Sequence, residues 1–140
     1  MPRSFRFEPP EPRPGSLTRP RLLRALLGRW EHRVTVVIGG PGLGKTTLLG
    51  QATAENSLAP RGRDVWIGLS PGDADGDALA RDVLAAVVAP ADGAPPPDAG
   101  AGGGRDEPPG PAAVAEAVWR QSPIAVCLVV DDVHLSLIHI

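Results

Sequence analysis

The stretch that most constrains this chain is GGPGLGKTTLLG, residues 39–50, which directly follows the apolar run VTVVI, residues 34–38. It matches the pattern G-x-x-x-x-G-K-[ST], with Lys45 and Thr46 as the last two residues of the match. In this pattern a buried strand ends in a glycine-rich loop, and a helix begins at the lysine. We therefore predict a strand over 34–38 buried on both faces, a phosphate-binding loop, and a helix over 45–56.

Lys45 is the only lysine in a chain that holds 14 basic residues. A compact ammonium suits a narrow loop better than the wide, planar fork of an arginine, and it would reach the β- and γ-phosphates of a nucleotide. The hydroxyl of Thr46 would hold Mg²⁺. The predicted phosphate-binding residues are Gly39, Gly40, Pro41, Gly42, Leu43, Gly44, Lys45, Thr46 and Thr47. The alternative is a strand-to-helix turn that binds nothing.

A second motif follows the apolar run IAVCLVV, residues 124–130, which predicts another buried strand ending in Asp131 and Asp132. The carboxyl ends of parallel strands share one edge of a sheet, so Asp131 is expected beside the phosphate loop, where it would serve Mg²⁺. Asp132 would orient the attacking water, which makes Lys45 and Asp132 the predicted catalytic residues. The alternative is that two carboxylates simply end a strand.

Strands and helices alternate along the rest of the chain. Further helices are predicted over 21–30, 77–88 and 111–120, and a further strand over 64–70. This alternation is typical of an α/β fold. We expect a P-loop NTPase parallel sheet with flanking helices, incomplete, with three strands present. An extended leader rich in proline and arginine would occupy 1–20, and a partial P-loop NTPase domain 21–140.

Composition locates the remaining segments. Many of the 17 glycines and 17 prolines gather in 90–110, which we predict to be a disordered insertion. The apolar residues 135–140 are expected to be a non-native tail. A net charge of −2, with neither a signal peptide nor a long apolar run, favours a cytoplasmic chain with no membrane partner. The single Cys127 excludes an internal disulfide and is expected to be a buried, inert thiol.

Four stretches together carry a family resemblance: RPGSLTRPRLLRALLGRW, GGPGLGKTTLL, DVWIGLSPGDADGDALARDVLAAV and CLVVDDVH, in that order. They resemble the N-terminal signal-transduction ATPase domain of large LuxR-type transcriptional regulators, the type of the maltose-regulon activator. The resemblance covers roughly 13–134, except for the insertion. It implies that ATP and Mg²⁺ bind at Gly39 to Thr47, that Thr46 and Asp131 serve the metal, and that Asp132 acts on water. The leader around residues 17–22 would lie near the adenine.

In that family, ATP binding favours a self-associating state and slow hydrolysis resets it. The resemblance thus implies an ATP-binding, ATP-hydrolysing switch in a signal-responsive regulator, with DNA bound only through a C-terminal domain absent from this chain. Two alternatives stay open: another P-loop NTPase, of the AAA+ type or a small-molecule kinase, and a nucleotide switch that does not hydrolyse. A further strand is expected beyond residue 140, between the loop strand and the Asp131 strand. We therefore expect this fragment to fold poorly, to associate through exposed strand edges and to be inactive, with ATPase activity confined to the full-length parent.

Overall fold

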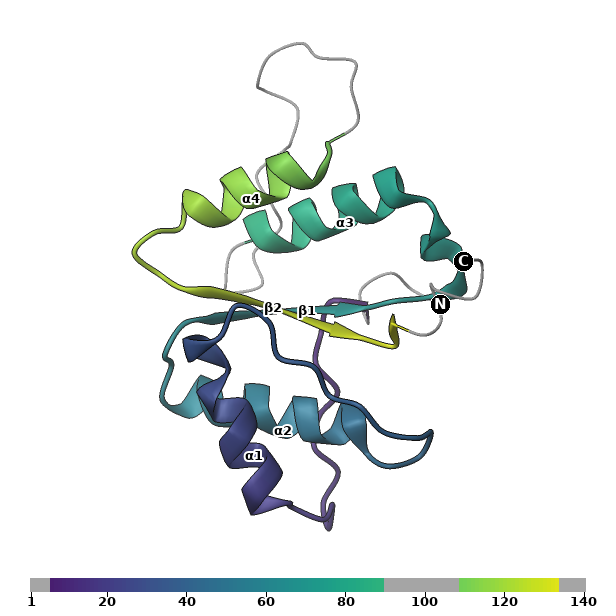
Figure 1. The fold of residues 1–140 in the computed structure, drawn as a ribbon, viewed down its shortest axis with the longest axis vertical. Coiled ribbons are helices and arrows are strands. Elements are labelled where there is room, and N and C mark those ends of the chain that lie inside the picture. The colour runs from purple at the N-terminus through teal and green to yellow at the C-terminus, as the bar shows by residue number, and fades with distance from the viewer. Residues whose placement is uncertain (1–5, 90–108, 134–140) are drawn as a thin grey trace.

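The structure is a computed structural model that describes residues 6–89 and 109–133. Within these ranges the chain is mixed α/β, with four α-helices and a two-stranded parallel sheet between two helical layers (Figure 1). One layer holds α1 and α2, and the other holds α3 and α4. In chain order the elements are α1 (Pro20–Leu27), the 3-10 helix η2 (Gly28–Glu31), α2 (Lys45–Leu58), β1 (Arg63–Gly68), the 3-10 helix η3 (Pro71–Ala74), α3 (Gly76–Val88), α4 (Pro111–Trp119) and β2 (Val126–Asp131).

The two strands run parallel, in a register that pairs Arg63 with Val126 and Gly68 with Asp131. The middle of β1 is buried on both faces, with Ile67 only 1% exposed. Burial of successive residues is the pattern of a strand covered by helices on each side. The predicted parallel sheet is confirmed for these two strands, whose ends lie within two residues of the expected bounds. The burial expected for the second strand is wrong for one face, because Leu128 and Val130 of β2 are 38% and 41% exposed.

The predicted strand over 34–38 is wrong. The segment has no assigned strand, and Val34, Val36 and Ile38 are 77%, 69% and 91% exposed; only Val37 lies partly buried against helices α1 and α2. A β-branched run indicates that a segment would suit a pleated surface, but a strand also needs a neighbour for its hydrogen bonds. Among the described residues no segment pairs with 34–38, so two strands are present rather than the three expected.

The layer of α1 and α2 is fixed by a small apolar cluster and by a buried ion pair. Leu26 of α1 packs against Leu48 and Ala52 of α2. Behind them, the guanidinium of Arg29 donates to both carboxylate oxygens of Asp64 on β1, at 2.6 and 3.2 Å. This pair joins the helical layer to the sheet at the start of β1.

The opposite layer is tied to the same strand by an arginine. Arg63, the first residue of β1, donates to the backbone oxygens of Ala86, Val87 and Ala89 at the end of α3. The last carbonyls of a helix have no partner within the helix, so a cationic side chain there satisfies them and opposes the helix dipole. Arg63 thus joins the sheet to the carboxyl end of α3.

Two predicted segments fall outside the described residues. Of the insertion predicted over 90–110, only residues 109 and 110 are described. The tail predicted over 135–140 lies entirely outside the described residues. Among the helices that the structure describes, none is both long and apolar enough to cross a bilayer.

Candidate phosphate-binding site

The glycine-rich segment forms a tight turn that leads directly into α2. Gly42 has φ +75° and Gly44 has φ +77°, both in the left-handed region. That region costs a residue with a side chain about 1–2 kcal/mol, and glycine does not bear this cost. Pro41 precedes Gly42, and this order suits a turn in which the third residue has positive φ. The local sequence thus explains how the chain reverses before the helix.

The amino end of α2 presents free backbone donors. The first hydrogen bond of the helix runs from the Leu48 N–H to the Gly44 oxygen, at 2.9 Å. The N–H groups of Lys45, Thr46 and Thr47 have no hydrogen-bond partner among the described residues, because the N-cap, Gly44, has no side chain. Unpaired N–H groups at the positive end of a 14-residue helix can receive an anion such as phosphate.

Lys45 folds back onto the loop. Its Nζ donates to the backbone oxygens of Gly39 and Gly40, at 2.9 and 2.7 Å. The ammonium is therefore held at the start of the glycine-rich loop. A phosphate at this position would compete with two neutral carbonyls for the lysine, and hydrogen bonds between ionised partners are the stronger kind.

The two predicted carboxylates lie at the carboxyl end of β2. Asp131 ends the strand and is 9% exposed, and it shares a strand face with Cys127 and Val129. Asp132 is exposed and has φ +57°, a conformation that aspartate adopts more readily than most residues. Figure 1 shows this end of β2 and the turn before α2 at the same end of the molecule.

The structure does not bring these carboxylates into contact with the loop. Among the hydrogen bonds and ion pairs of the described residues, none joins Asp131 or Asp132 to Lys45 or Thr46. The magnesium site of Thr46 and Asp131, and the role of Asp132 on water, therefore stay predictions.

The leader supplies contacts that the sequence did not predict. Arg19 donates from Nη1 to the Leu43 oxygen in the loop, at 2.8 Å. Arg6 donates to the Gly68 oxygen at 3.1 Å and to Asp73 at 2.8 Å. The only signal in the sequence was the excess of arginine before residue 34, because partners 24 to 67 positions apart leave no local pattern.

Two side chains near the sheet have shifted pKa values. Burial raises the pKa of Asp73, but hydrogen bonds from the Ser70 amide and hydroxyl, together with the Arg6 guanidinium, outweigh burial and hold it below the ordinary 3.8. Burial raises the pKa of the Cys127 thiol, and the nearby charge of Asp64 adds to the rise. A thiol that stays protonated is a poor nucleophile, in keeping with the expected inert cysteine, although Cys127 is only partly buried rather than buried as expected.

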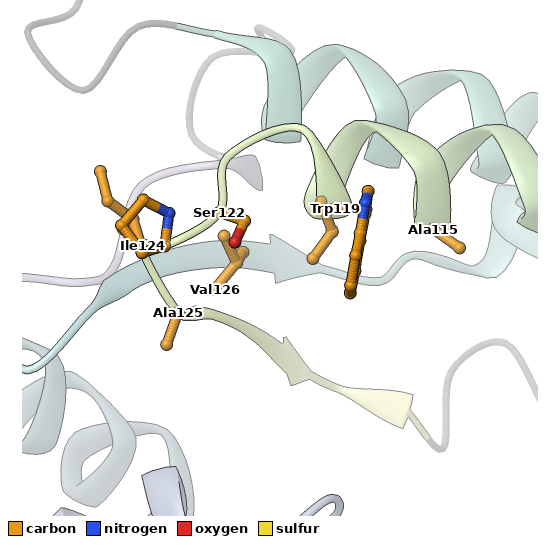
Figure 2. Close-up of a pocket in the computed structure, with 8 residues that line it drawn as sticks. Ala115, Trp119, Ser122, Ile124, Ala125 and Val126 are labelled. Atoms are coloured by element: carbon orange, nitrogen blue, oxygen red, sulfur yellow. The ribbon is translucent and has the colours of Figure 1, made fainter.

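Two surface hollows lie outside the glycine-rich loop. One, of about 320 Å³, lies between α4 and the start of β2, where Trp119 and Ile124 line it (Figure 2). It is at the amino end of β2, away from Asp131, and no charged group lines it. The other, of about 280 Å³, lies between the leader and α2, and its lining includes Thr18, Leu23 and Gln51.

No protein-family model matches this chain, and no curated protein and no solved structure matches it either.

Proposed function

We propose that this chain is the nucleotide-binding part of a P-loop NTPase and that its ligand is ATP with Mg²⁺. The observation that supports this most strongly is the start of α2. The segment Gly39 to Thr47 holds three N–H groups without a partner among the described residues, two glycines with positive φ and the ammonium of the chain's only lysine. Each of these features favours the binding of phosphate. A turn that binds no ligand would not need all of them together.

The predicted ligands have the chemistry that Mg²⁺ prefers. The Thr46 hydroxyl and the Asp131 carboxylate are oxygen ligands, the kind that Mg²⁺ prefers. No group of three or more histidine, cysteine, aspartate or glutamate side chains gathers within the described residues. Mg²⁺ commonly binds through one or two protein oxygens, water and substrate phosphates, so two protein donors suffice. When bound, the metal would offset phosphate charge, while Lys45 would hold the phosphates and Asp132 would orient water.

The resemblance assigns this module to a signal-responsive transcriptional regulator, in which ATP favours self-association and hydrolysis resets the state. The resemblance would place the adenine near residues 17–22. The hollow lined by Thr18 and Leu23 lies next to this part of the leader and would be the space open to the adenine. The reading frame downstream of residue 140 tests the assignment. Helical repeats followed by a helix-turn-helix would support it, whereas a sensor-arginine region or a small-molecule pocket would favour another P-loop enzyme.

Binding of ATP to the 140-residue chain tests the proposed ligand directly. Isothermal titration with ATP and Mg²⁺ should show saturable binding, and Lys45→Met should weaken it by at least about tenfold, because a charge-assisted contact to phosphate is lost. Arg24→Met is the matched control. It removes one positive charge from an exposed residue of α1 whose side chain makes no hydrogen bond or ion pair within the described chain. Equal binding by Lys45→Met, or no binding by a wild-type chain that circular dichroism shows to be folded, would reject the proposal.

Hydrolysis is a separate test. Asp132→Asn in the full-length parent should keep ATP binding and lose turnover, because the amide cannot accept a proton from water as the carboxylate can. Unchanged turnover would show that Asp132 does not act on water. Turnover absent from the unaltered parent would instead favour the non-hydrolysing switch.

A further inference from the structure

Arg19 links the N-terminal leader to the last peptide group before α2. It is the N-cap residue of α1, and its Nη1 donates to the Leu43 oxygen at 2.8 Å. That oxygen has no donor from the helix, because the first helical hydrogen bond ends on Gly44. Arg19 therefore satisfies a carbonyl at the boundary between the loop and the helix.

The contact determines where the next N–H group points. In a trans peptide the C=O and the N–H lie on opposite sides, so holding the Leu43 oxygen toward Arg19 turns the Gly44 N–H away from the leader. Gly44 has φ +77°, and a glycine in a turn is free to rotate unless its peptide is fixed from outside. Arg19 provides such a fixed point.

The leader that carries Arg19 is itself held against the sheet and α2. At its start, Arg6 contacts the Gly68 oxygen and Asp73. Further along, the Pro10 oxygen lies against Gly50, so close that a methyl group there would approach it to 2.9 Å. The position of Arg19 thus depends on a leader anchored at several points outside the loop.

We propose that Arg19 is a positioning residue that couples docking of the leader to the affinity of the loop for phosphate. The inference rests on the proposed function, because it assigns a regulatory input to the same loop. A docked leader fixes the peptide between Leu43 and Gly44 and so orders the N–H donor of Gly44. A displaced leader leaves that donor disordered, and every phosphate ligand binds less tightly for the same reason.

The test compares Arg19→Met with Arg24→Met, using inorganic pyrophosphate and ATP as separate probes with Mg²⁺. Methionine keeps a long apolar stem and removes the donor, while the Arg24 change removes the same charge elsewhere on α1. Titration should show Arg19→Met about fivefold weaker for both probes, the scale of one lost charge-assisted hydrogen bond. Arg24→Met should stay within about twofold of wild type.

The possible results separate the two proposals. If the wild-type chain is folded by circular dichroism and binds neither probe, the proposed function fails and the coupling fails with it. If the wild type binds but Arg19→Met binds equally well, only the coupling is overturned. A loss confined to ATP, with pyrophosphate unaffected, would also overturn it, because Arg19 would then contact the nucleoside.

A second variant and a second measurement separate positioning from general damage to the fold. Arg19→Lys keeps a donor and should recover part of the lost affinity; a lysine variant no better than methionine would contradict the proposal. In ligand-free ¹H–¹⁵N spectra, the Gly44 amide should shift in Arg19→Met and not in Arg24→Met. An unchanged Gly44 amide in Arg19→Met would overturn the coupling even if that variant were unstable.

Discussion

Asp64→Asn should destabilise the chain by about 3 kcal/mol. The carboxylate of Asp64 accepts three hydrogen bonds, two from Arg29 and one from Asn56. The side chains of Arg29 and Asp64 are only 7% and 11% exposed, so water cannot replace the lost acceptor. Breaking a buried pair from one side costs about 3–5 kcal/mol.

The structure places the expected cost at the lower end of that range. Arg29 also donates to the Leu26 oxygen at 3.0 Å, and its guanidinium lies over the Trp30 ring, 4.8 Å from the centroid. These contacts remain in the variant and partly compensate the charge. An asparagine at position 64 would keep one acceptor oxygen, but its N–H₂ group would face a donor of Arg29 or Asn56.

Urea unfolding, followed by tryptophan fluorescence at fixed chain concentration, measures the difference. Glu31→Gln is the control, because its ion pair with Arg61 is 3.4 Å long and both side chains are more than half exposed. It should change stability by less than about 0.5 kcal/mol. In thermal unfolding, the Asp64 variant should lose roughly 10 °C, at about 3 °C for each kcal/mol in a chain of this length.

The double variant Arg29→Met with Asp64→Leu completes the test. Replacing both charges with apolar groups removes the unpaired cation, so it should recover much of the stability that Asp64→Asn loses. A loss below about 1 kcal/mol for Asp64→Asn, equal to that of the exposed control, would refute the reasoning from burial. A wild-type chain too unstable to show a cooperative transition would support the expectation that these 140 residues fold poorly.

Three further predictions follow from particular contacts. Gly62→Ala should lower the free energy of unfolding in urea by about 1–3 kcal/mol, because the new methyl group would lie 2.5 Å from the Ala125 oxygen. Gly76→Ala, with open space around it, should leave stability unchanged or raise it. A larger loss for Gly76→Ala than for Gly62→Ala would contradict the steric argument. The lowered pKa of Asp73 stabilises the fold at pH values above 3.8, the ordinary pKa of an aspartate, and this stability is lost as the pH falls through the folded-state pKa. Asp73→Asn should therefore flatten the acid limb of a curve of stability against pH. An unchanged acid limb would refute the assignment. Because the pKa of Cys127 is raised, iodoacetamide should alkylate it more slowly at pH 8 in the native chain than in urea, and equal rates would show an accessible thiolate.

The local elements could be predicted because their signals lie within a few residues. Helix α2 begins at Lys45, where the glycine-lysine pattern placed it, since glycines in the left-handed region reverse the chain just before it. The parallel direction of β1 and β2 followed from apolar runs separated by helical patterns, although their pairing with each other was not predicted. These are properties of neighbouring residues, and periodicity and turn chemistry report them directly.

What depended on distant partners could not be predicted in the same way. The run over 34–38 has the composition of a buried strand, yet whether it becomes one depends on a neighbour, and no described segment pairs with it. The buried pair of Arg29 and Asp64 spans 35 positions, and the contact of Arg19 with Leu43 spans 24. The sequence by itself determined a glycine loop that opens a helix around the only lysine. Only the tertiary structure decided which arginines hold the loop and the sheet, because an exposed arginine and a pairing arginine look alike until the chain has folded.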